Sequence, residues 1–248
     1  MLSHVFEQPD GEAPIVLYLH GLAVGGWCWA PVRALLPENA ALIPDLPGHE
    51  GSAAIPWRSL ADTATRVAEV VDTLPPARPV HVTGHSLGGY VGLILLTLRP
   101  DRFASAMLSG FHVGKPPVPA LLKLAYLANG LIFRAPPLLR RFVGVFDDPA
   151  TARRFLAGAK VMDARTMYRA GSQVVDFVPP EGLDSLTLPI LAVAAADEPA
   201  AIRRMPDRLA RQHANIRGLV LDGRNHFWPI NEPALYAGTL RGHIARSK

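Results

Sequence analysis

A serine at residue 86 stands in a sequence that suits nucleophilic chemistry, Gly84-His85-Ser86-Leu87-Gly88. An apolar, β-type run over 79–83 precedes it, and an apolar, helix-like run over 91–98 follows it. A serine on so sharp a strand-to-helix turn is held clear of the sheet, and its small neighbours let the two elements approach closely. The Leu87 amide then lies at a helix N-terminus and faces any oxyanion formed on a substrate. The pattern predicts Ser86 as a nucleophile and Leu87 as an oxyanion donor.

A serine hydroxyl is a weak nucleophile at neutral pH, so it needs a positioned base and an acid that orients this base. His226 follows the last predicted strand, 216–221, and Asp197 follows the apolar strand 189–195. Parallel sheets present functional side chains at such strand ends. We therefore predict His226 as the base and Asp197 as its carboxylate partner. Glu198 and Asp222 are the alternative acids.

Composition narrows the classes of function. Hydrophobic residues make up 49% of the 248 residues, so a single core is expected. The net charge is only +4, and the sequence lacks the basic stripe interleaved with aromatic residues that is typical of nucleic-acid binding. We expect no membrane span, because no apolar stretch reaches about 18 residues without a charge or a proline. The acidic N-terminus does not resemble a secretory signal. The single cysteine, Cys28, excludes an internal disulfide and is typical of a cytoplasmic protein.

Cofactor and metal chemistry also lack a sequence signal. The histidines do not share ligand spacing with acids, and a cysteine pair is absent. Neither of the glycine-rich patterns that cradle dinucleotides or nucleotide phosphates occurs. We expect chemistry that uses no cofactor and no metal.

The chain alternates between strand-like and helix-like segments. Strand-like runs cover 15–19, 40–44, 79–83, 103–108, 189–195 and 216–221. Helical periodicity separates most of them, and such alternation predicts an α/β fold with a largely parallel sheet and helices on both faces. The alternation stops between about 112 and 185, where four helix-like pieces follow one another over 118–133, 136–145, 149–159 and 164–177. We interpret 112–185 as a helical cap inserted into a core formed by 1–111 and 186–248.

These features together resemble the α/β-hydrolase superfamily. The resemblance rests on His20-Gly21, the segment 45–49, the Ser86 motif, Asp197 and His226, and the chain order Ser, Asp, His is the family's. It implies a mostly parallel central sheet with an inserted cap. It also implies that Leu22, or alternatively Ala23, supplies the second oxyanion amide. A serine at the nucleophile position separates the chain from family members that use aspartate there.

The expected substrate is a small, mostly apolar molecule of the ester type. Aromatic and leucine residues near the catalytic loops and in the cap are the candidate substrate contacts: Trp27, Trp29, Leu121, Tyr126, Phe227 and Trp228. Two interpretations of the cap leucines stay open, a pocket wall or only the core of the cap. The resemblance favours hydrolysis of an ester, lactone or thioester. A lyase, cyclase or acyl transferase with the same triad, or a receptor that keeps a hydrolase pocket, are the alternatives. The oligomeric state is not indicated by the sequence.

Overall fold

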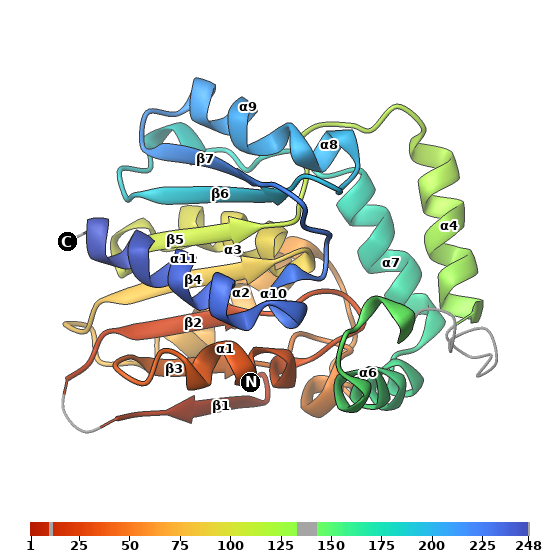
Figure 1. Cartoon of the computed structure of the whole chain (residues 1–248), viewed down its shortest axis with the longest axis horizontal. Coiled ribbons are helices and arrows are strands. Elements are labelled where there is room, and N and C mark those ends of the chain that lie inside the picture. The colour runs from red at the N-terminus through yellow and green to blue at the C-terminus, as the bar shows by residue number, and fades with distance from the viewer. Residues whose placement is uncertain (10–11, 133–142, 248) are drawn as a thin grey trace.

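Seven strands form one twisted sheet in the computed structural model, which describes residues 1–9, 12–132 and 143–247 (Figure 1). The strands are β1 (His4–Glu7), β2 (Ile15–Leu19), β3 (Ala40–Pro44), β4 (Val80–His85), β5 (Phe103–Ser109), β6 (Ile190–Ala195) and β7 (Ile216–Leu221). Their spatial order is β1-β3-β2-β4-β5-β6-β7. All neighbouring pairs are parallel except β1 with β3. The α/β architecture expected from the alternation is confirmed.

Alternate residues of the central strands enter two separate cores, one on each face of the sheet. Leu17 and Leu19 of β2 pack with the helices α2 and α3, whereas Val16 and Tyr18 pack with α1 and α11. The strand β2 is buried on both faces, and this explains its continuous apolar sequence. The helices of the core are α1 (Ala30–Ala34), α2 (Leu60–Val71), α3 (Leu87–Leu98), α8 (Ala200–Arg203), α9 (Met205–Gln212), α10 (Trp228–Asn231) and α11 (Pro233–Arg246).

The block between β5 and β6 is helical. Its helices are α4 (Pro119–Ile132), α6 (Pro149–Val161) and α7 (Ala164–Val175), and no strand occurs in it among the residues that the structure describes. The expected helix over 136–145 lies mostly outside the described residues. Figure 1 shows α4, α6 and α7 together at one end of the sheet, the end toward which the parallel strands run. The block therefore stands beside the strand ends where the candidate catalytic residues were expected.

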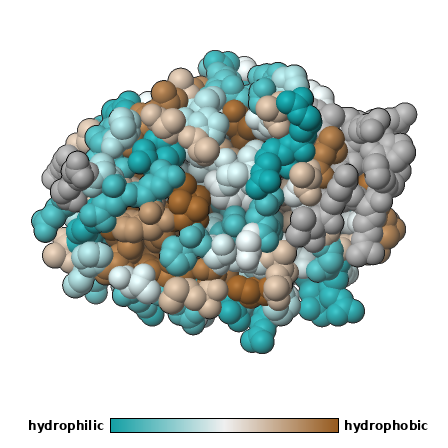
Figure 2. All heavy atoms as spheres, turned by 90° about the horizontal axis from the view of Figure 1, so that it is seen from below, coloured by the Kyte–Doolittle hydropathy of each residue, from teal (hydrophilic) through white to brown (hydrophobic). Residues whose placement is uncertain are grey.

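The edge strand β1 was not anticipated. All four of its residues are exposed, so it lacks the apolar run by which the buried strands are recognised in the sequence. Figure 2 views the molecule from below, on the side where Figure 1 places β1, and shows hydrophilic side chains around a compact hydrophobic patch. Within the described part of the chain, no helix has the length and hydrophobicity needed to cross a bilayer.

Candidate active site

Ser86 occupies the sharp turn between β4 and α3. Its backbone angles are φ 54° and ψ −116°, and a positive φ is unfavourable for a residue with a Cβ atom. The Ser86 amide donates a hydrogen bond of 2.8 Å to the carbonyl of Ser109 on the adjacent strand β5, which helps to hold the turn. Local strain of this kind persists only where the surrounding structure enforces it, and it concentrates at functional sites.

Two glycines make this turn possible by letting backbones approach. A Cβ atom on Gly88 would lie 2.0 Å from the Leu19 carbonyl oxygen, and one on Gly84 would lie 2.3 Å from the Gly88 carbonyl oxygen. Both contacts are to backbone atoms, which cannot move aside as a flexible side chain would. The glycines of the motif are therefore required by the crossing of β2, β4 and α3.

The acid that contacts His226 is Glu198, which corrects the expectation for Asp197. Oε1 of Glu198 lies 2.5 Å from Nδ1 of His226, and its Oε2 accepts a hydrogen bond of 2.7 Å from the Ala195 amide. The Glu198 side chain is fully buried, whereas Asp197 is exposed. The chain turns tightly after β6, since the Glu198 amide donates back to Ala195, and this turn directs the longer side chain inward. Asp222, the other alternative acid, is also exposed.

Two buried histidines hold the loop that follows β2. Nε2 of His20 accepts the Leu46 amide at 2.9 Å, and Nε2 of His49 accepts the Ala23 amide at 3.3 Å. Burial lowers the pKa of His20 to about 4 and that of His49 to about 3, so both rings are neutral and able to accept at pH 7. Because the Ala23 amide is already bonded to His49, Leu22 is the better candidate for the oxyanion donor in this loop.

His85 packs against the His226 ring, with ring centroids 4.6 Å apart. Its Nδ1 is 2.9 Å from the Ser109 hydroxyl oxygen. Burial is the main cause that holds the pKa of His85 well below its usual value, with the neighbouring His226 as a further cause. The ring is therefore a neutral packing surface beside His226.

Two cavities meet at the candidate nucleophile and base, and each has a volume of about 300 Å³. Ser86, Tyr126 and His226 line both of them. We call chamber A the cavity that also contacts the 21–24 loop and Ile230, and chamber B the one that also contacts His112 and Ile202. The described residues that line either chamber include no aspartate, glutamate, lysine or arginine.

The candidate substrate contacts divide into two groups. Tyr126 and Phe227 line the chambers as expected. Trp29 and Trp228 do not, because each is 1% exposed and packs against Tyr236 in the core. Leu121 is 62% exposed on the outer side of α4. These three residues stand close to the catalytic motifs or to Tyr126 in sequence, but their side chains point elsewhere.

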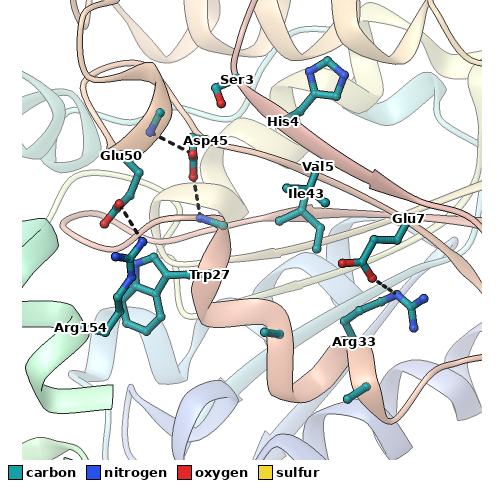
Figure 3. Close-up of a pocket in the computed structure, with 14 residues that line it drawn as sticks. Ser3, His4, Val5, Glu7, Trp27, Arg33, Ile43, Asp45, Glu50 and Arg154 are labelled. Atoms are coloured by element: carbon teal, nitrogen blue, oxygen red, sulfur yellow. Dashed lines mark hydrogen bonds and ion pairs between the residues drawn. The ribbon is translucent and has the colours of Figure 1, made fainter. Parts of the chain in front are cut away.

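Trp27 lines a different cavity, of about 540 Å³, shown in Figure 3. The Arg154 guanidinium carbon lies 5.8 Å from the centre of its ring, and Arg154 also pairs with Glu50 at 3.0 Å. Glu7 pairs with Arg33 at 3.1 Å across the same cavity. These two ion pairs neutralise four of the charged groups that line the cavity, and the carboxylate of Asp45 accepts from the Gly26 and Gly51 amides. Ser86 is not among the lining residues.

Several lining residues were not anticipated because they carry no motif. They include Asn129, Phe155 and Met167 in chamber A, and Tyr90, His112 and Ile202 in chamber B. Only helical periodicity could have marked those on α4 and α7, and it does not say which face meets the core. No group of histidine, cysteine or acidic side chains suited to a metal ion occurs among the described residues.

Comparison with known proteins identifies the family of the chain. The family described as "Alpha/beta hydrolase family" matches residues 16–239. A hydrolase of Acinetobacter baylyi, (E)-2-((N-methylformamido)methylene)succinate hydrolase, is 27% identical over 241 residues, which cover 93% of this chain and 89% of the relative.

Solved structures of similar fold cover nearly the whole chain. A thermophilic esterase from Thermogutta terrifontis aligns with a TM-score of 0.80 at 18% identity, over 99% of this chain and 93% of its own. The enol-lactonase from Burkholderia xenovorans LB400 aligns with a TM-score of 0.76 at 20% identity, over 98% and 96%. At sequence identities of 18% and 20%, these structural similarities show that the folds are alike.

Proposed function

The chain belongs to the alpha/beta hydrolase family, and on this premise we propose that it is a serine hydrolase of small, neutral, mostly apolar carboxylic esters. The observation that carries the proposal is the meeting of Ser86 and His226 in the same two chambers, with Glu198 bonded to the far side of the imidazole. A strained serine, a histidine and a buried carboxylate are the components of a nucleophilic triad.

In the proposed mechanism, Nε2 of His226 takes the proton from the Ser86 hydroxyl as its oxygen attacks the ester carbonyl. The Leu22 and Leu87 amides donate to the oxyanion, and Leu87 is suited to this because the first amides of a helix have no partner within it. The imidazolium then protonates the departing alcohol. Water activated by His226 hydrolyses the acyl enzyme and frees Ser86.

Glu198 has a defined part in this scheme. Its bond to Nδ1 fixes the tautomer that leaves Nε2 free to accept the serine proton, and its charge stabilises the imidazolium. The Ala195 amide holds the other carboxylate oxygen and so orients the acid. We assign the triad to Ser86, His226 and Glu198.

The chamber lining favours a neutral substrate. The described lining residues offer no lysine or arginine to a carboxylate, and burying an unpaired charge is costly. The succinate named for the Acinetobacter relative is therefore not the substrate class that we propose here. We also propose that the helices of 112–185 act as a cap, since Tyr126 of α4 and Val175 of α7 line chamber B together with Ser86.

The test is hydrolysis of p-nitrophenyl butyrate together with labelling by a fluorophosphonate, in the native protein and in Ser86→Ala. The native protein should turn over the ester and take one covalent label. The variant should lose both while keeping the native circular dichroism spectrum. A folded Ser86→Ala protein that retains a tenth of the native rate would remove Ser86 as the nucleophile.

A further inference from the structure

His112 lies in the loop that follows β5, and the backbone of this loop is held on both sides of it. The His112 amide donates a hydrogen bond of 3.1 Å to the Tyr90 hydroxyl. The His112 ring packs edge-on against the Tyr90 ring, with centroids 5.6 Å apart. Arg208 of α9 donates a hydrogen bond of 3.1 Å to the carbonyl of the next residue, Val113. These contacts fix the position of the His112 side chain before any ligand arrives.

A bond to Gly114 determines which nitrogen of the His112 ring carries the proton. Nδ1 of His112 lies 3.0 Å from the Gly114 carbonyl oxygen, and Gly114 has a φ of 86°, which favours glycine. A carbonyl oxygen can only accept, so Nδ1 is the donor of this bond. Burial is the main cause that lowers the pKa of His112, so the ring is neutral at pH 7. Nε2 of the neutral ring therefore presents a lone pair and can only accept a hydrogen bond.

Nε2 of His112 has no partner within the part of the chain that the structure describes, and the atom is not enclosed by protein. The residue is only 7% exposed, and the cavity that it lines is chamber B, which Ser86 and His226 also line. The accessible nitrogen therefore faces the space where a substrate would lie. Apolar side chains such as Val175 and Ile202 form much of the remaining lining. A buried acceptor in such surroundings is costly to leave without a donor.

We propose that His112 is a specificity-determining residue and that its Nε2 accepts a hydrogen bond from a hydroxyl group of the substrate. This inference rests on the proposed function and narrows its substrate class to neutral esters that carry one hydroxyl on an otherwise apolar chain. A hydroxyl is a neutral donor, which suits a chamber whose described lining has no charged residue. The analogue with a methyl group in place of the hydroxyl leaves Nε2 without a donor, and such a site discriminates against it.

Pairs of esters that differ only in a terminal hydroxyl or methyl group test the proposal. On the acyl side, methyl ω-hydroxypropanoate is compared with methyl butyrate, and methyl ω-hydroxyhexanoate with methyl heptanoate. On the alkoxy side, hydroxyethyl butyrate is compared with propyl butyrate, and ω-hydroxybutyl butyrate with pentyl butyrate. The native protein should have the higher kcat/KM for the hydroxy ester in at least one pair, measured by acid release. Hydroxy esters that are no better than their methyl partners in every pair would overturn the proposal.

Two substitutions of His112 separate recognition of the substrate from support of the loop. The amide of His112→Asn can replace Nδ1 in the bond to Gly114, but asparagine has no atom at the position of Nε2. This variant should lower the hydroxyl-to-methyl ratio of kcat/KM by about tenfold in the preferred pair, the usual worth of one hydrogen bond. His112→Gln returns an amide acceptor near the position of Nε2 and should recover part of the ratio. If His112 only supports the loop, His112→Asn keeps the native ratio, and that result would overturn the proposal.

The matched control is His4→Asn, since His4 is exposed on the edge strand β1 and lines neither chamber. It should keep the native ratio. A ratio that is lost in Tyr126→Phe but kept in His112→Asn would give the hydroxyl contact to Tyr126 and refute the assignment to His112. If His112→Asn does not fold, the native ester pairs and His112→Gln still decide. Turnover of the methyl partners without a hydroxyl preference refutes this inference alone, whereas the absence of all ester turnover refutes the proposed function.

Discussion

Oε1 of Glu198 lies 2.5 Å from Nδ1 of His226, across the carboxyl ends of the adjacent strands β6 and β7. The side chain of Glu198 is fully buried, while that of His226 is 32% exposed and reaches both chambers. The acid thus lies behind the base and the reacting space lies in front of it. In the proposed mechanism, the carboxylate orients the imidazole and Nε2 of His226 transfers the proton.

Glu198→Gln should lower kcat by about 10³- to 10⁴-fold, because an amide neither fixes the imidazole tautomer in the same way nor stabilises the imidazolium. Asp197→Asn is the matched control, since Asp197 is the adjacent acid and is exposed. It should remain near the native rate in the same p-nitrophenyl butyrate assay. Loss of activity in Asp197→Asn with retention in Glu198→Gln would return the acid role to Asp197.

Ser86→Gly should remove activity and raise stability. Glycine adopts the positive φ of this turn at little cost, so the strain stored at Ser86, of order 1–3 kcal/mol, is partly released. Thermal unfolding of the native protein, Ser86→Ala and Ser86→Gly would measure this. We expect the glycine variant to have the highest Tm of the three. A lower Tm for Ser86→Gly than for Ser86→Ala would argue against strain at the turn.

The buried strands and the serine turn could be predicted because their signals are local. Continuous apolar runs specify strands covered on both faces, and the glycines around Ser86 are needed by backbone contacts that neighbouring residues determine. The position of His226 at the carboxyl end of the sheet was suggested by the strand 216–221, which ends five residues before it. The loss of alternation after 112 indicated a run of helices, and for the described residues α4, α6 and α7 lie within a few residues of the expected ranges.

The choice between Asp197 and Glu198 depended on information that the sequence does not carry. Adjacent residues in a tight turn point in different directions, and only the hydrogen bond between the Glu198 amide and Ala195 settles which one turns inward. The expectation that Trp29 and Trp228 contact the substrate differs from the structure for a related reason. Trp29 and Trp228 are near catalytic loops, but the hydrophobic effect favours filling the core with the largest apolar side chains.

Ester substrates with a charged tail should be turned over poorly. Methyl hexanoate and monomethyl adipate have acyl chains of the same length, and the second ends in a carboxylate. The described lining of the chambers has no cation to pair with it, so kcat/KM for monomethyl adipate should be lower by about 100-fold, or roughly 2.7 kcal/mol. Equal turnover of the two esters, measured by acid release, would show that the site accepts anions.

Gly88→Ala should prevent folding or cost about 3 kcal/mol or more, because the new methyl group would lie 2.0 Å from the Leu19 carbonyl oxygen. Gly238→Ala makes the matched control. Gly238 lies on the exposed side of α11, and a Cβ atom there meets nothing within 4 Å. Alanine should stabilise this helix by about 0.5–1 kcal/mol. Urea unfolding of both variants measures the contrast, and equal stabilities would show that the β2–α3 crossing tolerates a side chain.

Buried histidines should make the protein less stable as the pH falls below 7. Burial lowers the pKa of His20 to about 4, of His49 to about 3 and of His243 to about 4, while an unfolded histidine titrates near 6.5. Between these values the unfolded chain binds protons that the native state does not. The contribution of the neutral buried histidines to the stability of the native state is complete above about pH 7, and it is lost as the pH falls through the unfolded pKa near 6.5.

The free energy of unfolding should therefore decrease between pH 7 and pH 5, a window in which ordinary carboxylates stay ionised in both states. Each fully responding histidine contributes up to about 1.4 kcal/mol per pH unit. His243 lines neither chamber. His243→Gln should therefore reduce the slope of the unfolding free energy by up to about 1.4 kcal/mol per pH unit, the contribution of one histidine. Urea titrations at pH 7, 6 and 5 give the slope directly. A free energy that stays constant over this window would show that the buried histidines accept protons in the native state.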